Sequence, residues 1–256
     1  MALWEDIAAA LRQAIERGDY PPGSLIPKET DLMAAHGTGR DPVRRAVAQL
    51  TAEGLLEPRR RRGTAVRARP PRRRLTRSRT VYRDEIGYYF DQAAQPWRAL
   101  RPPQVTRGPV PYDIAALLGV APGAEAVIRD RLMGDPATGE PAQIATTYIP
   151  AALAAELPVL AGTDTGPGGI YDRMEEAGHG PIRWTEAITA RMPDPAEAAA
   201  LRLPPGVPLL RIIRLAASPA GRPLEVNDTR LNAEQFEIGY PITRHTTARA
   251  APQASE

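Results

Sequence analysis

Cysteine is absent from this chain of 256 residues. Without thiols, the protein has no disulfides, no thiolate metal ligands and no cysteine nucleophile. This composition agrees with a reducing compartment such as the cytoplasm. We therefore expect no redox chemistry.

Long apolar runs are also missing, since none approaches the roughly 20 residues needed to span a bilayer. The first ten residues, MALWEDIAAA, include Glu5 and Asp6, whereas a signal peptide carries basic residues in this position. We expect a soluble protein, located in the cytoplasm.

Recognisable catalytic motifs are lacking as well. The histidines, His36, His179 and His245, lie far apart in the sequence, and none belongs to an HExxH motif. Ser218 lies in AASPAG rather than in a GxSxG elbow. The GPGG at residues 166–169 is not followed by the GK[ST] of a phosphate-binding loop, so it reads as a turn. We predict no metal site, no cofactor and no enzymatic activity.

Lysine occurs once, as Lys28, so nearly all of the 33 basic residues are arginines. A GC-rich coding bias explains this better than selection for bidentate contacts does. Residues 1–83 hold 18 Lys or Arg and 9 Asp or Glu, whereas the remainder holds 15 and 21. Attraction to a polyanion such as DNA is therefore concentrated in the first third. The length suits two domains.

Three helices are expected in the basic part. An apolar stripe predicts a first helix that ends near Gly18: Trp4, Ile7, Ala8, Leu11 and Ile15. Breakers then separate it from a short second helix over residues 28–36: Pro21, Pro22, Gly23 and Pro27. A third helix begins near Gly39, with Asp41 and Pro42 in its first turn.

The third helix has two faces. Apolar residues recur at helical spacing on one of them: Val43, Ala46, Val47 and Leu50. Arg40, Arg44 and Arg45 occupy other faces, where a guanidinium can bond guanine O6 and N7 or grip a phosphate. An ordinary solvated charged face is the alternative. After Gly54, an extended segment, a turn of arginines at residues 59–62 and a return over residues 63–67 predict a β-wing.

The stretch LRQAIERGDYPPGSLIPKETDLMAAHGTGRDPVRRAVAQLTAEGLLEPRRRRGTAV resembles the winged helix-turn-helix module of the GntR family of bacterial repressors. The resemblance implies that these residues lie at the DNA: Lys28, Thr30, Arg40, Arg44, Arg45, Arg61, Arg62, Gly63 and Thr64. The chain departs from the family pattern at four positions, which hold Lys28, Gly39, Pro42 and Arg61. Two hydroxyls are lost and charge is added, so we expect an operator sequence unlike those of better-known relatives.

Residues 67–79, RARPPRRRLTRSR, lose apolar periodicity, and we expect an Arg- and Pro-rich linker over residues 68–79. Such a chain is extended and solvated, and it either serves as a plain spacer or adds attraction to phosphates. We hypothesise that Arg72, Arg73 and Arg74 strengthen nonspecific DNA binding.

From residue 80 onward, β-like runs alternate with alanine-rich helical segments. The predicted strands are AVIRDRLM, QIATTYIP, WTEAITARM, PLLRIIRLAAS and PLEVNDTRL. The predicted helices cover residues 111–120, 151–157, 169–177 and 195–203. Because long helical crossovers do not join every strand pair, we expect an α+β domain with an antiparallel sheet over residues 80–243. The tail, residues 246–256, has no periodicity and is expected to be disordered.

This second part is similar to the UTRA ligand-sensing domain of the HutC subfamily, which has a chorismate-lyase-like fold. The motifs that carry the resemblance are VIRDRL, GEP, TYIP, GGIYDRMEEAG, GRPLEVNDTRL and FEIGY. The resemblance implies a small-molecule effector, often a sugar phosphate or carboxylate, held by these residues: Arg129, Arg131, Tyr148, Tyr171 and Glu225. A family acidic position is Ala145 here and a tyrosine position is Leu231, so an amino-sugar phosphate should not be assumed.

Arg129 and Arg131 are two residues apart on a predicted strand, so they share a face on which they can hold an anion. The alternative is that one of them pairs with Glu225 or Asp228 as ordinary surface charge. Tyr148 and Tyr171 are as often core residues as ligand contacts.

The resemblance implies a homodimeric repressor that binds a palindromic operator, associates with the nucleoid when DNA-bound, and is modulated by its effector. Two alternatives stay open: a chorismate-lyase-like enzyme tethered to DNA, and a ligand-independent DNA-binding protein. Fold alone does not carry chemistry, so a sensor is favoured over an enzyme.

Overall fold

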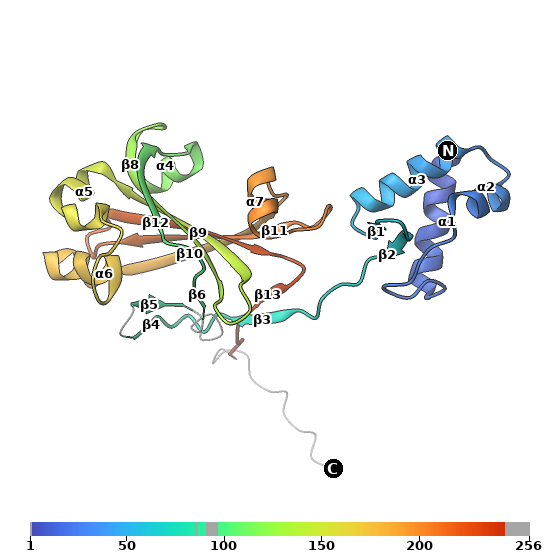
Figure 1. Ribbon diagram of the computed structural model, residues 1–256. Coiled ribbons are helices and arrows are strands. Elements are labelled where there is room, and N and C mark those ends of the chain that lie inside the picture. The colour runs from blue at the N-terminus through green and yellow to red at the C-terminus, as the bar shows by residue number, and fades with distance from the viewer. Residues whose placement is uncertain (1, 85–86, 91–96, 244–256) are drawn as a thin grey trace, which may run out of the picture.

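The structure is a computed structural model that describes residues 2–84, 87–90 and 97–243. A small N-terminal head is joined to a larger domain of mixed sheet and helix (Figure 1). Among the described residues, no helix is long and apolar enough to cross a membrane. The tail predicted to be disordered lies outside the described residues.

The head contains α1 (Leu3–Arg17), α2 (Glu29–His36), α3 (Arg40–Ala52) and a hairpin of β1 (Leu56–Arg59) and β2 (Gly63–Val66). The predicted three helices and wing are confirmed. Gly18 and Gly37 end the first two helices in the left-handed conformation, which glycine adopts without strain. Lys28 and Gly39 are the N-cap residues of α2 and α3.

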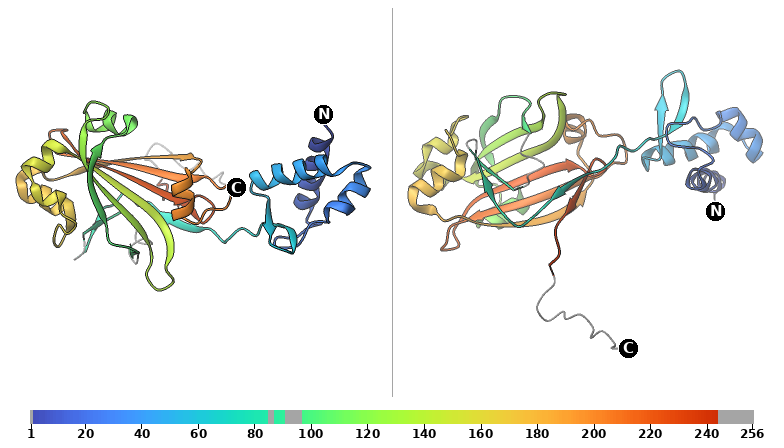
Figure 2. Two further views of the ribbon diagram at one scale, coloured as in Figure 1. Left: turned by 45° about the horizontal axis from the view of Figure 1, so that its top comes forward. Right: turned by 90° about the horizontal axis from the view of Figure 1, so that it is seen from below.

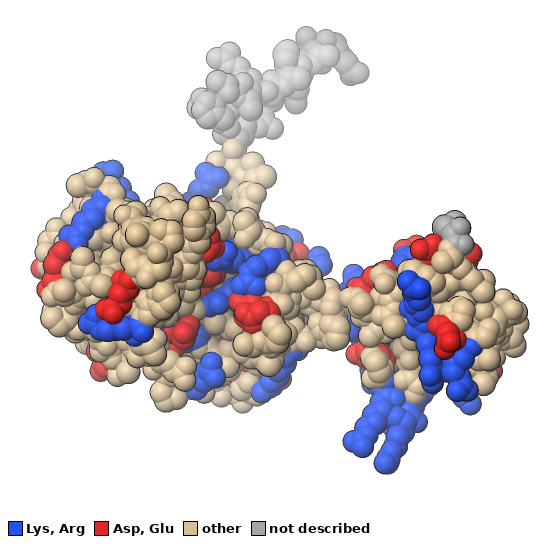
Figure 3. Space-filling view, turned by 90° about the horizontal axis from the view of Figure 1, so that it is seen from above, with Lys and Arg blue, Asp and Glu red and all other residues tan. Residues whose placement is uncertain are grey.

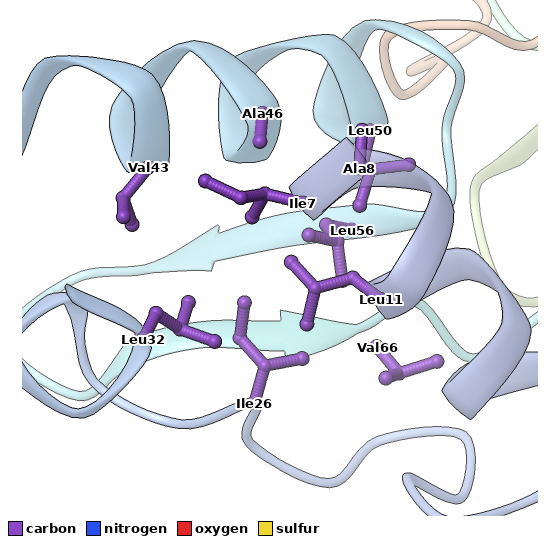
Figure 4. Close-up of a cluster of buried hydrophobic side chains, with 10 residues drawn as sticks. All are labelled: Ile7, Ala8, Leu11, Ile26, Leu32, Val43, Ala46, Leu50, Leu56 and Val66. Carbon is purple, nitrogen blue, oxygen red and sulfur yellow. The ribbon is translucent and has the colours of Figure 1, made fainter. Parts of the chain in front are cut away.

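One apolar cluster holds the head together, and it draws on all three helices and both wing strands (Figure 4). Val43, Ala46 and Leu50 of α3 are fully buried against α1, which confirms the predicted apolar face. The rest of the cluster consists of Ile7, Ala8, Leu11, Ile26, Leu32, Leu56 and Val66. Burial of this face fixes the opposite face of α3 toward solvent.

The larger domain is built on an antiparallel sheet of seven strands. The sheet runs in the order β10, β11, β12, β9, β8, β6, and β7 also pairs with β8. The five predicted strands are confirmed as β8 (Glu125–Asp135), β9 (Glu140–Pro150), β10 (Arg183–Arg191), β11 (Leu209–Ala217) and β12 (Pro223–Asn232). β6 (Arg98–Ala99) and β7 (Gln104–Pro109) were not predicted, because their short polar sequences lack alternation.

Helices cover both faces of this sheet. Leu153 of α5 (Ala151–Glu156) and Met174 of α6 (Gly169–Met174) pack in one cluster with Val127 and Ile149. Ile114 of α4 (Tyr112–Leu118) packs on the other face. Helix α7 (Pro195–Ala200) precedes β11, the 3₁₀ turn η2 (Pro158–Ala161) follows α5, and the π-helical turn η3 (Glu175–His179) follows α6. The four predicted helices are confirmed in shorter form.

The predicted linker contains a strand. β3 (Arg73–Thr76) pairs in parallel with β13 (Phe236–Gly239), so its second half belongs to the larger domain. Leu75 explains the difference, because this one apolar residue is buried while its neighbours are exposed, and a single residue shows no periodicity. A two-stranded pair, β4 (Tyr82–Arg83) and β5 (Tyr88–Tyr89), follows.

The head contacts the larger domain at the end of α3, and Figure 2 shows the narrow connection between them. Arg67 is buried, and it donates to the carbonyl of Gly54 at 2.6 Å and forms an ion pair with Glu234. The turn at Gly206 lies so close that a Cβ there would be 2.5 Å from the carbonyl oxygen of Ala52. We call these residues, Gly54, Arg67, Gly206 and Glu234, the docking contact.

Asp194 caps the N-terminus of α7, and its replacement tests how much this cap contributes to the stability of the domain. Its Oδ1 accepts from the backbone N–H of Glu197 at 2.8 Å, and its own N–H donates to the Glu197 carboxylate at 3.0 Å. We expect Asp194→Ala to lower the free energy of unfolding by about 1 kcal/mol in urea titrations. Glu16→Ala, which alters an exposed residue of α1, is the control; equal losses in both variants would contradict the cap.

Candidate functional site

The exposed face of α3 carries the predicted base-reading arginines. The side chains of Arg40 and Arg44 are 59% and 58% exposed, and their Nε atoms lie 3.7 and 3.2 Å from the Glu29 carboxylate on α2. Glu29 thus holds two guanidinium groups at the junction of α2 and α3. Arg45 is exposed too, but its guanidinium lies 4.5 Å from the centre of the Trp4 ring.

The other predicted DNA contacts lie at the start of α2 and on the wing. Lys28 and Thr30 are exposed, as are Arg61, Arg62 and Gly63, whereas Thr64 is half-buried. Arg61 has a φ of 62°, which turns the chain between β1 and β2. Basic side chains project from the head in Figure 3. The head therefore offers a helix face and a basic hairpin to an anionic partner.

A cavity of about 500 Å³ lies in the larger domain, on the face of the sheet that bears α6. Its polar floor comes from neighbouring strands: Arg131 on β8, Thr147 on β9 and Glu225 on β12. Arg131 Nη2 donates to Thr147 Oγ1 at 2.7 Å, and the Tyr171 hydroxyl of α6 donates to Glu225 Oε2 at 3.0 Å. Three of the five predicted effector residues thus line one cavity.

Burial sets the protonation of this floor. Burial raises the pKa of the fully buried Glu225 to about 7, although the positive charge of Arg214 and the hydrogen bond from Tyr171 oppose the shift. Burial lowers the pKa of Arg131, and the charge of Glu225 opposes that shift. Burial also raises the pKa of the Tyr171 phenol, with a further contribution from Glu225. Glu225 is therefore poised to exchange a proton near neutral pH.

Aromatic and apolar side chains form the walls. Tyr88 and Phe90 lie edge-on to Tyr171, with ring centres 5.6 and 6.4 Å apart. Trp97 lies edge-on to Phe236 at 5.3 Å. The remaining apolar lining includes Leu75, Ala99, Met133, Ala145 and Ile170. The site thus combines aromatic and apolar walls with polar and charged side chains on the sheet.

Two predicted effector residues do not line the cavity. Arg129 lies on the same strand face as Arg131, as the spacing predicts, but its guanidinium donates to the carbonyls of Leu160, Gly162 and Thr163. It ties β8 to the loop after α5. Tyr148 lies on the opposite face, in the cluster beneath α4.

The predicted alternative pairing with Asp228 does not occur either. The Asp228 carboxylate accepts from Arg211 at 2.9 Å, and Arg230 lies 3.8 Å from it. Within the described part of the chain, no carboxylate lies within ion-pair distance of Arg131 or Arg129.

Comparisons with known proteins agree with this two-part arrangement. Residues 3–66 match the model of the bacterial regulatory proteins of the gntR family, and residues 104–237 match the UTRA domain. An uncharacterized HTH-type transcriptional regulator of Rhizobium meliloti is 31% identical over 93% of this chain and 94% of its own length. The chain belongs to the GntR family.

Two further relatives extend the similarity of this GntR protein over most of its length. An uncharacterized HTH-type transcriptional regulator of Streptomyces coelicolor is 30% identical over 87% of the chain and 86% of its own length. The crystal structure of a putative GntR-family transcriptional regulator superposes with a TM-score of 0.68 at 27% identity, covering 96% of this chain and 99% of that one. The chain is a transcriptional regulator with a DNA-binding GntR domain and an effector-binding UTRA domain. The prediction of a regulator rather than an enzyme is confirmed.

Sequence reasoning missed several cavity residues of the GntR protein. Asn227 and Thr229 alternate with Glu225 on one face of β12, so the two-residue period of the strand could have found them. Arg214 could have been found in the same way from its position opposite Asn227. Tyr88 and Trp97 precede the first helix and the first strand that the sequence predicts in this domain.

Proposed function

We propose that this GntR protein is a repressor that binds a palindromic operator as a homodimer. The observation that carries the proposal is the exposed arginine face of α3, opposed by a fully buried apolar face. In the proposed complex, α3 enters the major groove, with Arg40 and Arg44 at the bases, while Lys28, Thr30 and the wing hold phosphates. Two-fold symmetry of the dimer dictates the symmetry of the operator.

The effector in this proposal binds the cavity at Arg131, Tyr171 and Glu225, and it favours one position of the heads over another. Support comes from the path between the cavity and the docking contact. Strand β12 carries Glu225 in the cavity floor and leads directly to Glu234, which pairs with Arg67. Leu75 of β3 lines the cavity a few residues after Arg67. A shift of β12 therefore reaches the head through the ion pair of Glu234 with Arg67, and a shift of β3 reaches it through the chain that joins β3 to Arg67.

Nuclease footprinting on the intergenic DNA beside the gene, with and without candidate metabolites, tests the proposal. We expect protection of one palindromic site, two subunits per site, and loss of protection with one metabolite. Protection without sequence preference, unaffected by any metabolite, would favour the ligand-independent alternative. Turnover of chorismate by the full chain would favour the enzyme.

The arginines before and within β3 test the electrostatic part of the proposal. Arg72 is exposed, whereas Arg74 donates to Glu237 at 2.6 Å and Arg73 lies 5.8 Å from the Trp97 ring. We expect replacement of all three by glutamine to reduce the slope of log affinity for nonspecific DNA against log salt, by about 0.9 for each lost phosphate contact. An unchanged slope would show that this segment does not approach DNA.

A further inference from the structure

Two buried polar atoms in the cavity floor have no hydrogen-bond partner among the residues that the structure describes: Arg131 Nε and Glu225 Oε1. The Glu225 side chain is fully buried; its other oxygen accepts from Tyr171, and Thr147 also hydrogen-bonds to the carboxylate. A native structure rarely leaves buried polar atoms unpaired, because each costs free energy that a ligand would restore. A ligand that accepts a hydrogen bond from Arg131 Nε and also hydrogen-bonds to Glu225 Oε1 would satisfy both atoms.

The charges of the floor narrow the chemistry of that ligand. Arg214 forms a 2.5 Å ion pair with Glu186, and Arg77 lies 3.7 Å from the same carboxylate. Arg131 feels the charge of Glu225, but among the described residues no carboxylate lies within ion-pair distance of its guanidinium. One negative charge would match this guanidinium, whereas the second charge of a phosphate dianion would have to compete with Glu186 for Arg214 and Arg77, which also line the cavity.

The walls narrow the body of the ligand. Tyr88, Phe90, Trp97 and Tyr171 surround the cavity with ring faces and edges. Aromatic rings prefer aromatic partners in offset or edge-on geometry, and such pairs add to the gain from buried area. The hydrogen-bonding side chains Gln143, Thr147, Asn227 and Thr229 lie on β9 and β12, so the hydroxyls of a sugar that faced the aromatic rings would lose their hydrogen bonds to water there.

We propose that the effector is a small aromatic monocarboxylic acid, held by its carboxylate between Arg131 and a protonated Glu225, with its ring among Tyr88, Phe90 and Trp97. This inference rests on the proposed function, because it names the chemistry of the same effector. The carboxylate accepts from Arg131 Nε, and Glu225 Oε1–H donates to its second oxygen. Where Glu225 is ionised in the empty cavity, one proton is taken up from solvent on binding.

Several charged or titratable groups surround Glu225 and bear on this proton. Arg131 on β8, Arg214 on β11 and Tyr171 on α6 act on it directly. Glu186 on β10 and Arg77 lie behind Arg214. Asp84, Tyr88 and Arg98 also line the cavity. Burial holds the pKa of Glu225 at about 7, and an arriving carboxylate raises it further.

Calorimetric titration of the full chain with five probes tests the class of ligand. The probes are benzoate, cyclohexanecarboxylate, benzamide and glucosamine 6-phosphate, with cinnamate as a longer aromatic acid. We expect an aromatic acid to bind, cyclohexanecarboxylate to bind about 2- to 10-fold more weakly, and benzamide and the sugar phosphate to bind more weakly still. Tighter binding of the sugar phosphate, or no binding of either aromatic acid at millimolar concentration, overturns the proposal.

Two cavity variants test the role of each floor residue. Arg131→Met is expected to weaken binding of the aromatic acid about 10- to 150-fold, since a charge-assisted hydrogen bond is lost. Arg107→Met is the matched control, because Arg107 forms an exposed pair with Glu125. Unchanged affinity in a folded Arg131→Met protein, judged by circular dichroism, overturns the placement of the carboxylate.

The pH dependence tests Glu225. The probe stays ionised between pH 6 and pH 8, so wild-type affinity is expected to fall about tenfold over this range as Glu225 loses its proton. Glu225→Gln keeps a donor that does not titrate, and its affinity is expected to be independent of pH. Glu125→Gln should retain the wild-type profile. A flat wild-type profile, or the same slope in Glu225→Gln, overturns the role of Glu225.

Binding and operator release are measured separately, so the inference and the proposed function fail in different ways. If an aromatic acid binds with the expected dependence on Arg131 and on pH but leaves the operator footprint unchanged, the proposed regulation is wrong and the inference holds. If a sugar phosphate releases the operator while aromatic acids do not bind, the proposed regulation holds and the inference is wrong.

Discussion

Replacing Glu234 with alanine is expected to release the head from the effector domain. Glu234 is the acidic partner of Arg67, whose side chain is 6% exposed. Removing one member of a buried ion pair costs about 3–5 kcal/mol, because the other charge is left without compensation. Undocking returns Arg67 to water and avoids this cost, so the separated arrangement becomes the more stable one.

The absence of cysteine makes this release measurable by pulsed electron paramagnetic resonance. Spin labels on Ala10→Cys in α1 and Ala116→Cys in α4, both exposed positions, report the distance between the two parts. We expect a narrow distribution in the parent and a broad one in the Glu234→Ala protein. Glu237→Ala, which breaks only the exposed pair with Arg74, is the control. Identical distributions in all three would show that the docking contact does not hold the head.

Replacing Arg44 with alanine is expected to weaken binding to the operator by about 1–3 kcal/mol, if the guanidinium makes a bidentate base contact. Its side chain is 58% exposed and is not a member of the buried cluster, so the head should fold unchanged. The ion pair with Glu29 is a surface pair, whose loss costs little stability. The effect should therefore appear in DNA affinity and not in thermal unfolding.

Fluorescence anisotropy with operator DNA at fixed salt measures the change. Arg17→Ala is the matched control. It removes an exposed arginine that lies at the C-terminal end of α1 and pairs with Asp19. We expect the control to lose only the small contribution of one distant charge. Equal affinity of wild type and Arg44→Ala for the operator would exclude Arg44 from base reading.

Local pattern was enough to predict the head, because helical spacing, breakers and the wing turn all occur within short stretches of sequence. Leu50 and Val43 belong to one stripe, and Gly18 and Gly37 end helices at the positions where glycine is favoured. β3 was missed for the opposite reason. Its partner, β13, lies some 160 residues later in the chain, and the sequence around Leu75 contains no local pattern that indicates this pairing.

The candidate site shows the same division. The spacing of Arg129 and Arg131 placed them correctly on one strand face, but strand periodicity carries no information about the length and direction of a side chain beyond that face. The carbonyls that accept hydrogen bonds from Arg129 belong to a loop whose position could not be predicted from the sequence. Tyr148 was assigned by family motif, whereas its even-numbered position on β9 puts it with Val226 on the other face.

The parallel pairing of β3 with β13 constrains how this regulator can exchange parts with its relatives. A chimera cut at residue 79, just after the basic stretch, would leave Leu75 on the DNA-binding part. Phe236 and Leu231 of the larger domain, which Leu75 helps to cover, would then be exposed. A chimera that joins this sensory half to a foreign DNA reader must therefore carry the chain from Arg73 onward. Recombination between such genes has its permissive junction within residues 68–72.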